Sequence, residues 1–497
     1  MRTLIACSLG VASGIFAFAV AAGATGSLIA ASGTAVAAGG LVAWAFRSRP
    51  FVPLDEAACS RGLKILAAAA TILALVQLVR LAVFMVDSSQ RAYSSVPSSD
   101  WEARHSCLSA YFVAARAAGR VPNIYADSLY TRPDDDPKTI RKPLMIGPFN
   151  IDVYEYPPPF LLLPRALRLA FPDFMRFRMM WFGLNSTVVL LAMLVLARAL
   201  GPGAGTRALL LSPLVWVALP TLSTLQKGNA QALIIAISVI ALALFDRRRW
   251  AAGGALLAYA TVSKLYPGLL VVYLVVRRQW RAVAWTAALC VALAALSLLD
   301  TGWAPYRAFL ARLSGLVGGE AFPAFRNPMA MAINFSVPGL VFKLKLFGVP
   351  GMNFAAAKLV GWIYTMIAVA VIVAAARRPV SESQKPLMWL AIIILATLRS
   401  PFLPQAYAAF PPLVLLVLLG AMSAPTPRTL AAILLTWLAL DIMWPTDWAM
   451  DPRLLALLSG IPQTVTIILA VIALRGAGRA SPEGATAFRQ ALQSARR

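Results

Sequence analysis

Histidine and cysteine are scarce in this chain of 497 residues. There is one histidine, His105, and the four cysteines (Cys7, Cys59, Cys107 and Cys290) show no paired spacing. This pattern predicts neither a disulfide framework nor a cysteine–histidine metal cluster. The chain also contains no Walker A loop and no Gly-x-Ser-x-Gly motif. These absences argue against ATP as the energy source and against hydrolysis by a nucleophile-elbow serine.

Charged residues are sparse as well. They make up 13% of the sequence, whereas hydrophobic residues make up 60%, and the mean hydropathy is +0.74. This composition excludes a soluble domain and is typical of an integral membrane protein. The formal net charge of +25 does not indicate nucleic-acid binding. The basic residues form short clusters between apolar segments instead of a continuous recognition stripe.

Apolar segments of membrane-spanning length recur along the whole chain. Residues 3–46 hold two Ala/Gly-rich segments, for which a cleaved signal peptide is the alternative interpretation, and a third segment covers 63–86. Further spans are expected at 180–198, 208–224, 230–245, 250–264, 266–276, 282–299, 355–376, 386–400, 405–421, 429–445 and 457–474. We therefore expect an all-α polytopic membrane protein with roughly 12–14 transmembrane helices.

These spans divide the chain into four regions. Residues 1–62 are expected to form two N-terminal transmembrane helices and a cytoplasmic turn, and residues 63–420 the membrane core. Residues 421–475 would form the C-terminal transmembrane helices, and residues 476–497 a basic cytoplasmic tail. Arginine clusters follow alternate spans, so the positive-inside rule places them in the cytoplasm. We expect the protein in the plasma (inner) membrane, with the polar loop 87–158 on the extracytoplasmic side.

The polar loop Asp87–Pro158 is the longest break between apolar segments, and it holds His105 and nearly half of the acidic residues. Apolar residues at helical spacing predict an amphipathic helix over residues 103–118. Asp100 would stand at its N-cap, as a plain helix cap or as a carboxylate held above the membrane surface. Residues 159–178 are short and interrupted by arginine, which favours a surface-lying or re-entrant amphipathic segment.

Three basic residues stand on the expected outer side, against the charge bias of the rest of the chain. They are Lys227, Lys264 and Arg399, and each follows or ends an apolar segment. A phosphate or other anionic headgroup would explain a cation at that face. The alternative is that each side chain reaches ordinary lipid phosphates at the membrane surface.

Several short motifs follow the early span in a fixed order. They are Asp100-Trp101, Asn123-Ile124-Tyr125, Tyr156-Pro157-Pro158, Gly228-Asn229-Ala230-Gln231, Ala252-Gly253-Gly254, Lys264-Leu265-Tyr266-Pro267, Arg277-Arg278-Gln279-Trp280-Arg281 and Ser400-Pro401. In this order and spacing the chain resembles glycosyltransferase family 87, over roughly residues 63–420. The resemblance implies the architecture of the C-type membrane glycosyltransferases, with amphipathic or juxtamembrane helices at the outer face.

The resemblance also implies a reaction and its residues. The donor would be a polyprenyl-phosphate sugar, with mannose as the family default, and the acceptor a glycolipid or glycan. Asp100, or alternatively Asp87, would be the single general base of an inverting transfer. Lys264, Arg399 and Lys227 would bind the donor phosphate, and Asn229, Gln231, Tyr266, Tyr156 and His105 are candidates for sugar or headgroup contacts. For His105 the alternative is an exposed or capping histidine. We expect no cofactor and no metal site, with a divalent metal left as an open alternative.

Two other functions compete with this interpretation. A secondary transporter or lipid flippase would place its polar residues at mid-membrane in broken helices. A non-catalytic protein of envelope assembly would not need these polar residues to meet in one cavity. A transferase instead predicts an outer-face cavity lined jointly by Asp100, Lys264 and Arg399.

Overall fold

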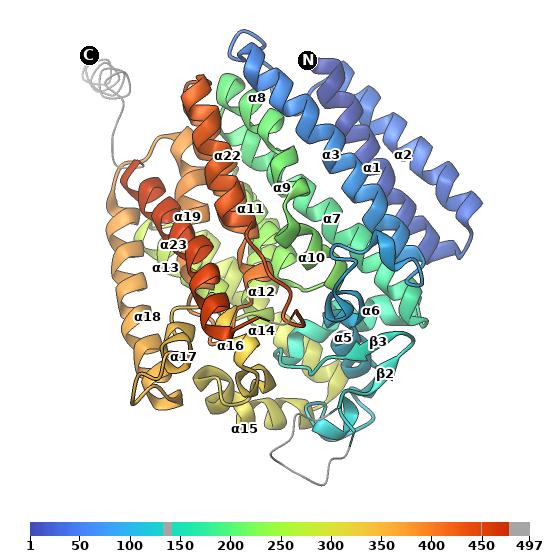
Figure 1. The fold of residues 1–497 in the computed structure, drawn as a ribbon, viewed down its shortest axis with the longest axis vertical. Coiled ribbons are helices and arrows are strands. Elements are labelled where there is room, and N and C mark those ends of the chain that lie inside the picture. Colours follow the sequence, from blue (N-terminus) through green and yellow to red (C-terminus); the bar gives the residue numbers. More distant parts are fainter. Residues whose placement is uncertain (133–141, 449, 477–497) are drawn as a thin grey trace.

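Helices dominate the structure, a computed structural model that describes residues 1–132, 142–448 and 450–476 (Figure 1). Within these residues, eight helical segments are long and apolar enough to cross a membrane. They are α1 (Arg2–Thr25), α2 (Leu28–Ser48), α3 (Arg61–Val86), α7 (Phe174–Ala199), α14 (Trp280–Thr301), α18 (Phe354–Arg377), α20 and α21 (Gln405–Ala408 and Phe410–Met422) taken together, and α23 (Pro452–Gly476). The expected all-α polytopic membrane fold is confirmed.

The other expected spans are present as shorter or bent helices. α8 (Pro202–Leu211) and α9 (Pro213–Val217) meet α10 (Leu219–Lys227) at an angle of 64°, and together they form a ninth span if they cross the membrane. The shorter apolar helices are α11 (Gln231–Asp246), α12 (Trp250–Ser263), α13 (Leu269–Val276), α19 (Lys385–Thr397) and α22 (Pro427–Asp441). Pro213 and Pro220 explain two of the breaks, because proline lacks the backbone donor that continues a helix.

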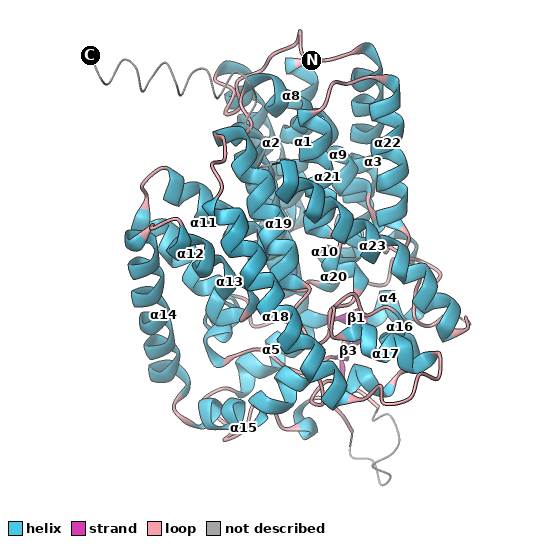
Figure 2. Cartoon of the chain, turned by 90° about the vertical axis from the view of Figure 1, so that its left-hand side faces the viewer, coloured by secondary structure: helices cyan, strands magenta, loops and turns pink. Residues whose placement is uncertain are grey.

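The polar loop 87–158 folds at one end of the molecule, which we call the loop end. It contains α4 (Asp100–Arg104), α5 (Cys107–Ala117) and three short strands, β1 (His105–Ser106), β2 (Met145–Ile146) and β3 (Phe149–Ile151). The strand order is β1-β3-β2, with β1 parallel and β2 antiparallel to β3. Figure 2 shows β1 and β3 at this end, close to α4 and α5.

The single helix expected over residues 103–118 is wrong, because the chain leaves the helical conformation in between. α4 ends at Arg104, His105 and Ser106 are extended, and α5 begins at Cys107. Pairing of His105 with Asn150 and of Ser106 with Ile151 stabilises the break. The N-cap of α4 is Ser99, whose side chain accepts a hydrogen bond from the Glu102 N–H, so Asp100 is the first helical residue and not the cap.

Other short helices also lie at the loop end. They are α6 (Leu162–Ala170), α15 (Ala304–Gly318), α16 (Pro328–Ala332) and α17 (Gly339–Leu346). The 3-10 turns of the described chain are η1 (Arg91–Tyr93), η2 (Asp127–Leu129), η3 (Pro158–Leu161), η4 (Tyr266–Gly268), η5 (Pro323–Arg326) and η6 (Glu382–Gln384). α6 is nine residues long, too short to cross a membrane, as expected for the segment before α7.

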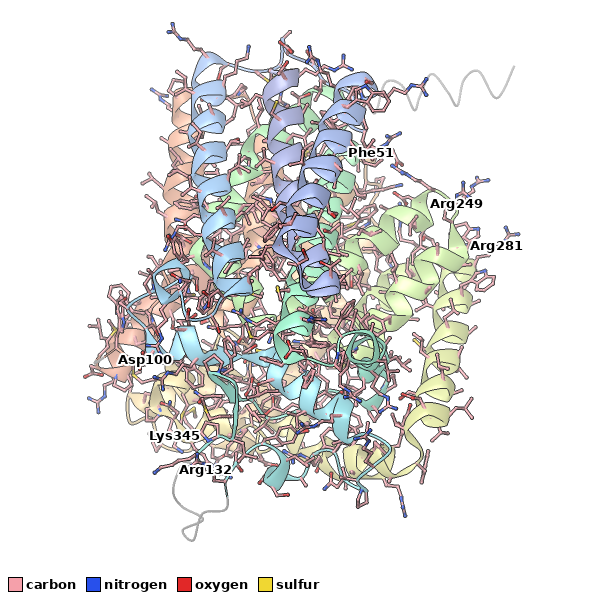
Figure 3. All side chains as sticks on the ribbon, turned by 90° about the vertical axis from the view of Figure 1, so that its right-hand side faces the viewer. Phe51, Asp100, Arg132, Arg249, Arg281 and Lys345 are labelled. Atoms are coloured by element: carbon pink, nitrogen blue, oxygen red, sulfur yellow. The ribbon has the colours of Figure 1, made fainter. Side chains whose placement is uncertain are left out.

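Arginine-rich turns lie away from the loop end. Figure 3 shows Arg249 and Arg281 toward the opposite end, which we call the basic end, and Asp100, Arg132 and Lys345 at the loop end. The basic tail expected over residues 476–497 lies outside the described residues, apart from Gly476. The separation of the two ends is what a positive-inside orientation requires.

Candidate active site

A cavity of about 720 Å³ lies between the polar loop and three breaks in the helices. These breaks are the α10–α11 turn, the α12–α13 turn and the segment 399–407 before α21. The polar lining consists of Trp101, Glu102, His105, Cys107, Asp152, Glu155, Tyr156, Lys227, Asn229, Ser263, Lys264, Tyr266, Asn327, Thr365, Arg399, Ser400, Gln405, Tyr407 and Thr446. An apolar wall includes Leu265, Leu269, Phe309, Leu313, Leu316 and Val317. Polar groups from distant parts of the chain therefore face one space.

Most of the residues singled out in the sequence meet at this cavity. Lys227, Lys264, Arg399, Asn229, Tyr266, Tyr156 and His105 all line it. Gln231 does not line it, but its Oε1 accepts a hydrogen bond of 2.8 Å from Lys264 Nζ and so positions that lysine. The individual roles expected of these residues stay predictions.

The two aspartates expected to act as the base lie elsewhere. Asp100 is on the surface, with 68% of its side chain exposed, and pairs with Arg91 at 2.7 Å and Arg104 at 4.0 Å (Figure 3). Asp87 ends α3 and accepts hydrogen bonds from the backbone and hydroxyl of Ser89. Neither carboxylate is part of the cavity lining.

Three other carboxylates line the cavity instead: Glu102, Asp152 and Glu155. They were not among the site residues predicted from the sequence. Asp152 and Glu155 belong to the segment Asp152-Val153-Tyr154-Glu155-Tyr156, directly before Pro157. The run of prolines was a usable signal, because proline stiffens the chain and so fixes the position of the residues before it.

Asp152 is held in place by the small sheet and by α5. The backbone N–H of Asp152 donates to Ser109 Oγ at 2.9 Å, and Ser109 Oγ contacts the Asn150 carbonyl at 3.1 Å. Pairing of β1 with β3 brings His105 next to this segment, so that His105 Nε2 lies 3.7 Å from Asp152 Oδ2. The exposed part of the Asp152 side chain, 39%, faces the cavity.

Burial tunes the ionisable groups of the loop. It raises the pKa of the Asp152 carboxyl to about 6, although the Val153 N–H, Cys107 and Lys227 act in the opposite direction. Burial, and then the charge of Lys227, lowers the pKa of His105 to about 3, so this imidazole is neutral at pH 7. Burial and the nearby Asp152 raise the pKa of Glu155 well above its usual range. Asp152 is therefore mostly ionised at neutral pH, whereas burial favours the neutral form of Glu155.

Lys227 already has an anionic partner. Its Nζ lies 2.6 Å from Glu102 Oε1, and both side chains are buried. Ser223 donates a hydrogen bond of 2.9 Å to the other Glu102 oxygen, and the Gln226 amide donates to the Glu102 carbonyl. A closed ion pair of this kind leaves little charge for a ligand, and it ties α4 to α10.

Lys264 and Arg399 have neutral partners. Lys264 Nζ donates to Gln231 and lies 5.0 Å from the centre of the Tyr156 ring. Arg399 Nε donates to Thr365 Oγ1, and its guanidinium lies 5.6 Å from the centre of the Trp362 ring. Within the described part of the chain, no carboxylate is within ion-pair distance of either cation. Their positive charge is thus available to an anionic ligand in the cavity.

Comparison with known proteins agrees with this arrangement. The sequence model of glycosyltransferase family 87 matches residues 154–403, which is half of the chain and includes Lys227, Lys264 and Arg399. Comparisons with curated proteins and with solved structures give no match. The family points to a transferase and not to a transporter or an assembly protein. The chain belongs to glycosyltransferase family 87 and is a membrane glycosyltransferase.

Proposed function

We propose that this protein transfers a hexose, with mannose as the family default, from a polyprenyl-phosphate sugar to a glycolipid or glycan acceptor. One observation carries the proposal: a single cavity is lined by the Asp152 carboxyl together with Lys264 and Arg399, two cations without a carboxylate partner among the described residues. Such a transfer needs a base for the acceptor and positive charge for the departing phosphate.

The two parts of the cavity fit the two parts of the donor. Lys264 and Arg399 would hold the phosphate through charge-assisted hydrogen bonds, which are strongest where water is partly excluded. The apolar wall formed from η4, α13 and α15 would hold the first isoprene units. The Tyr266 hydroxyl is buried without a hydrogen-bond partner in the described chain, and this donor is available to a sugar hydroxyl. Asn229 and Tyr156 are the other candidates for sugar contacts, and the neutral His105 is a candidate for the headgroup.

Asp152 would act as the single general base, in place of Asp100 or Asp87. It takes the proton from the acceptor hydroxyl while that oxygen forms a bond to the anomeric carbon. The bond between this carbon and the phosphate oxygen breaks, and the phosphate leaves with the electron pair. No acid is needed, since a phosphate monoester is already a good leaving group, and attack opposite the phosphate inverts the anomeric centre. Glycosidases usually need two carboxylates because their leaving group is poorer.

The loop end would face the extracytoplasmic side of the plasma (inner) membrane. The arginine clusters at the basic end would then lie in the cytoplasm, as the positive-inside rule requires. A lipid-linked donor reaches this cavity from the bilayer, so the enzyme needs no soluble nucleotide sugar at that surface.

The test measures sugar transfer in proteoliposomes that contain labelled polyprenyl-phosphate sugars. It compares the same substitution, aspartate to asparagine, at a cavity position and at a surface position. We expect Asp152→Asn to lower kcat by at least about 100-fold, which is the lower range for loss of a general base. Asp100→Asn, on the surface, should leave kcat unchanged. The assignment of the base is overturned if Asp152→Asn is fully active, and it returns to Asp100 if the effects are reversed. A wild-type protein that transfers from none of the lipid-linked donors would overturn the donor class.

A further inference from the structure

Three side chains at one wall of the cavity carry atoms that metal ions prefer. They are His105 from β1, Cys107 from the first turn of α5 and Asp152 from the segment after β3. His105 Nε2 lies 3.7 Å from Asp152 Oδ2 and 3.7 Å from Cys107 Sγ. One atom from each residue lies within 4.8 Å of the other two.

This spacing matches the edges of a tetrahedral metal site. Bonds of about 2.0–2.3 Å from Zn²⁺ to nitrogen, oxygen and sulfur put neighbouring ligand atoms about 3.3–3.6 Å apart at tetrahedral angles. The observed distances are slightly longer, so small side-chain shifts would close the site. A fourth position remains open toward the cavity, which all three side chains line. Three protein ligands with one open position is the usual plan of a reactive zinc site.

The surrounding residues already hold these three side chains in place. The Asn229 amide donates to Cys107 Sγ at 3.3 Å, and the Tyr407 hydroxyl lies 3.2 Å from Cys107 Sγ and 3.3 Å from His105 Nε2. The Trp101 ring stacks on the imidazole with the ring centres 4.5 Å apart. The Val153 N–H binds Asp152 Oδ1, which leaves Oδ2 as the oxygen nearest to His105. The contacts from Asn229 and the Val153 N–H are of the kind that orients ligands and strengthens metal binding, whereas the Tyr407 hydroxyl would give up its contact with Nε2 to the metal.

The charges also suit a divalent cation. A thiolate, a carboxylate and a neutral imidazole would balance a charge of two, and the thiol proton would be released on binding. Lys227 is the cation of this wall, but its charge is offset by Glu102 at 2.6 Å. A sulfur ligand favours Zn²⁺ and other thiophilic ions over Mg²⁺ or Ca²⁺.

We propose that His105, Cys107 and Asp152 form a binding site for a thiophilic divalent cation such as Zn²⁺, and that the bound metal stops transfer. Binding stands on the geometry alone. The inhibition rests on the proposed function, because a metal bound to Asp152 removes the carboxylate that would accept the proton. The Asp152 side chain can then either bind the metal or accept the proton, but it cannot do both at once.

The binding is tested on the full chain in detergent, with Zn²⁺ by calorimetry and with Co²⁺ as a coloured substitute. We expect a single Zn²⁺ per chain and a thiolate–cobalt charge-transfer band. Cys107→Ser and His105→Gln should each weaken Zn²⁺ binding by more than about 100-fold, because loss of an outer contact alone costs roughly 10- to 100-fold. Cys290→Ser, on α14 and away from the cavity, is the matched control and should bind normally.

Two results would overturn the site: absence of Zn²⁺ binding by the wild type, or equal binding by Cys107→Ser. If a variant fails to fold, alkylation of Cys107 in the wild type serves as the test instead. Zn²⁺ should protect the Cys107 thiol against alkylation, and an equal alkylation rate with and without Zn²⁺ would count against the site.

Inhibition is measured separately, as the Zn²⁺ concentration that halves each protein's own transfer rate. We expect a chelator to restore the transfer rate of the wild type. In Cys107→Ser the Zn²⁺ concentration that halves the rate should rise by more than about 100-fold, in parallel with the loss of Zn²⁺ affinity. Zn²⁺ binding without inhibition would overturn the regulatory half of the proposal. An inactive wild type that still binds Zn²⁺ would instead count against the proposed function and leave the metal site intact.

Discussion

Lys227 and Lys264 line the same cavity with the same charge, but their surroundings differ, so we expect different roles for them. Lys227 is paired with Glu102 at 2.6 Å, whereas the nearest polar partner of Lys264 is the neutral Gln231 at 2.8 Å. An ion pair that is already closed contributes mainly to the fold, and its rupture leaves a buried charge uncompensated. A cation with neutral partners can bind a phosphate without first losing an anion.

Lys264→Ala should therefore weaken donor binding. A hydrogen bond to a charged group is worth about 1.5–3 kcal/mol, so we expect the KM for the polyprenyl-phosphate sugar to rise by roughly 10- to 150-fold, with a smaller change in kcat. Initial rates in proteoliposomes at varied donor concentration measure this. Lys345→Ala is the control, because Lys345 is exposed on α17 and outside the cavity lining. An unchanged KM in Lys264→Ala would make this lysine a contact to bulk lipid instead.

At the scale of elements, the turn between α10 and α11 fixes one wall of the site. Gly228 ends α10 with φ +67° and ψ 26°, the left-handed conformation, and carries Lys227 on one side and Asn229 on the other. A methyl group at Gly228 would overlap Leu108 of α5. The turn thus requires glycine at position 228 for two reasons. The backbone there is in the left-handed conformation, and α5 approaches too closely to leave room for a side chain.

Gly228→Ala and Gly348→Ala separate these two reasons. Both glycines have positive φ, but a methyl group at Gly348 would meet nothing within 4 Å. Each substitution should cost about 1 kcal/mol of backbone strain, and only Gly228→Ala should lose a further 1–3 kcal/mol from overpacking. Thermal unfolding in detergent should show a clearly lower Tm for Gly228→Ala. Equal Tm values for the two variants would mean that α5 moves aside without cost.

At the scale of the whole molecule, the cavity and the arginine-rich turns lie toward different ends. The loop end carries the cavity, while arginines such as Arg249 and Arg281 lie toward the basic end (Figure 3). Long apolar helices connect the ends, as a membrane protein requires. A bilayer around these helices would place the two ends in different compartments.

Single cysteines at the two ends test the orientation. In a background in which all four native cysteines are replaced by serine, a membrane-impermeant maleimide should label Lys345→Cys in intact cells. Arg249→Cys should be labelled only after permeabilisation, because positive charge is retained in the cytoplasm. The reverse pattern would place the cavity in the cytoplasm and contradict the extracytoplasmic donor.

The membrane class, the helical fold and the cations that line the cavity could all be predicted from the order of residues alone. Hydropathy is a sum over residues that are neighbours in the chain, so it can be calculated without knowledge of the tertiary structure. Lys227, Lys264 and Arg399 were recognisable because each stands at the end of an apolar segment, where a base is conspicuous. Helix lengths were less well determined, because breaks such as the one at Lys264–Gly268 depend on local backbone turns inside an otherwise apolar run.

Which carboxylates line the cavity with those cations depends on how the chain folds in three dimensions. Asp100 has the sequence context of a loop aspartate, yet Arg91 and Arg104 hold it at the surface. Asp152 reaches the cavity because β1 pairs with β3 and Ser109 bonds to the segment that follows. The same pairing brings His105 and Cys107 beside Asp152. Contacts between residues this far apart in the chain leave no local pattern, since they depend on how the loop packs and not on the order of its residues.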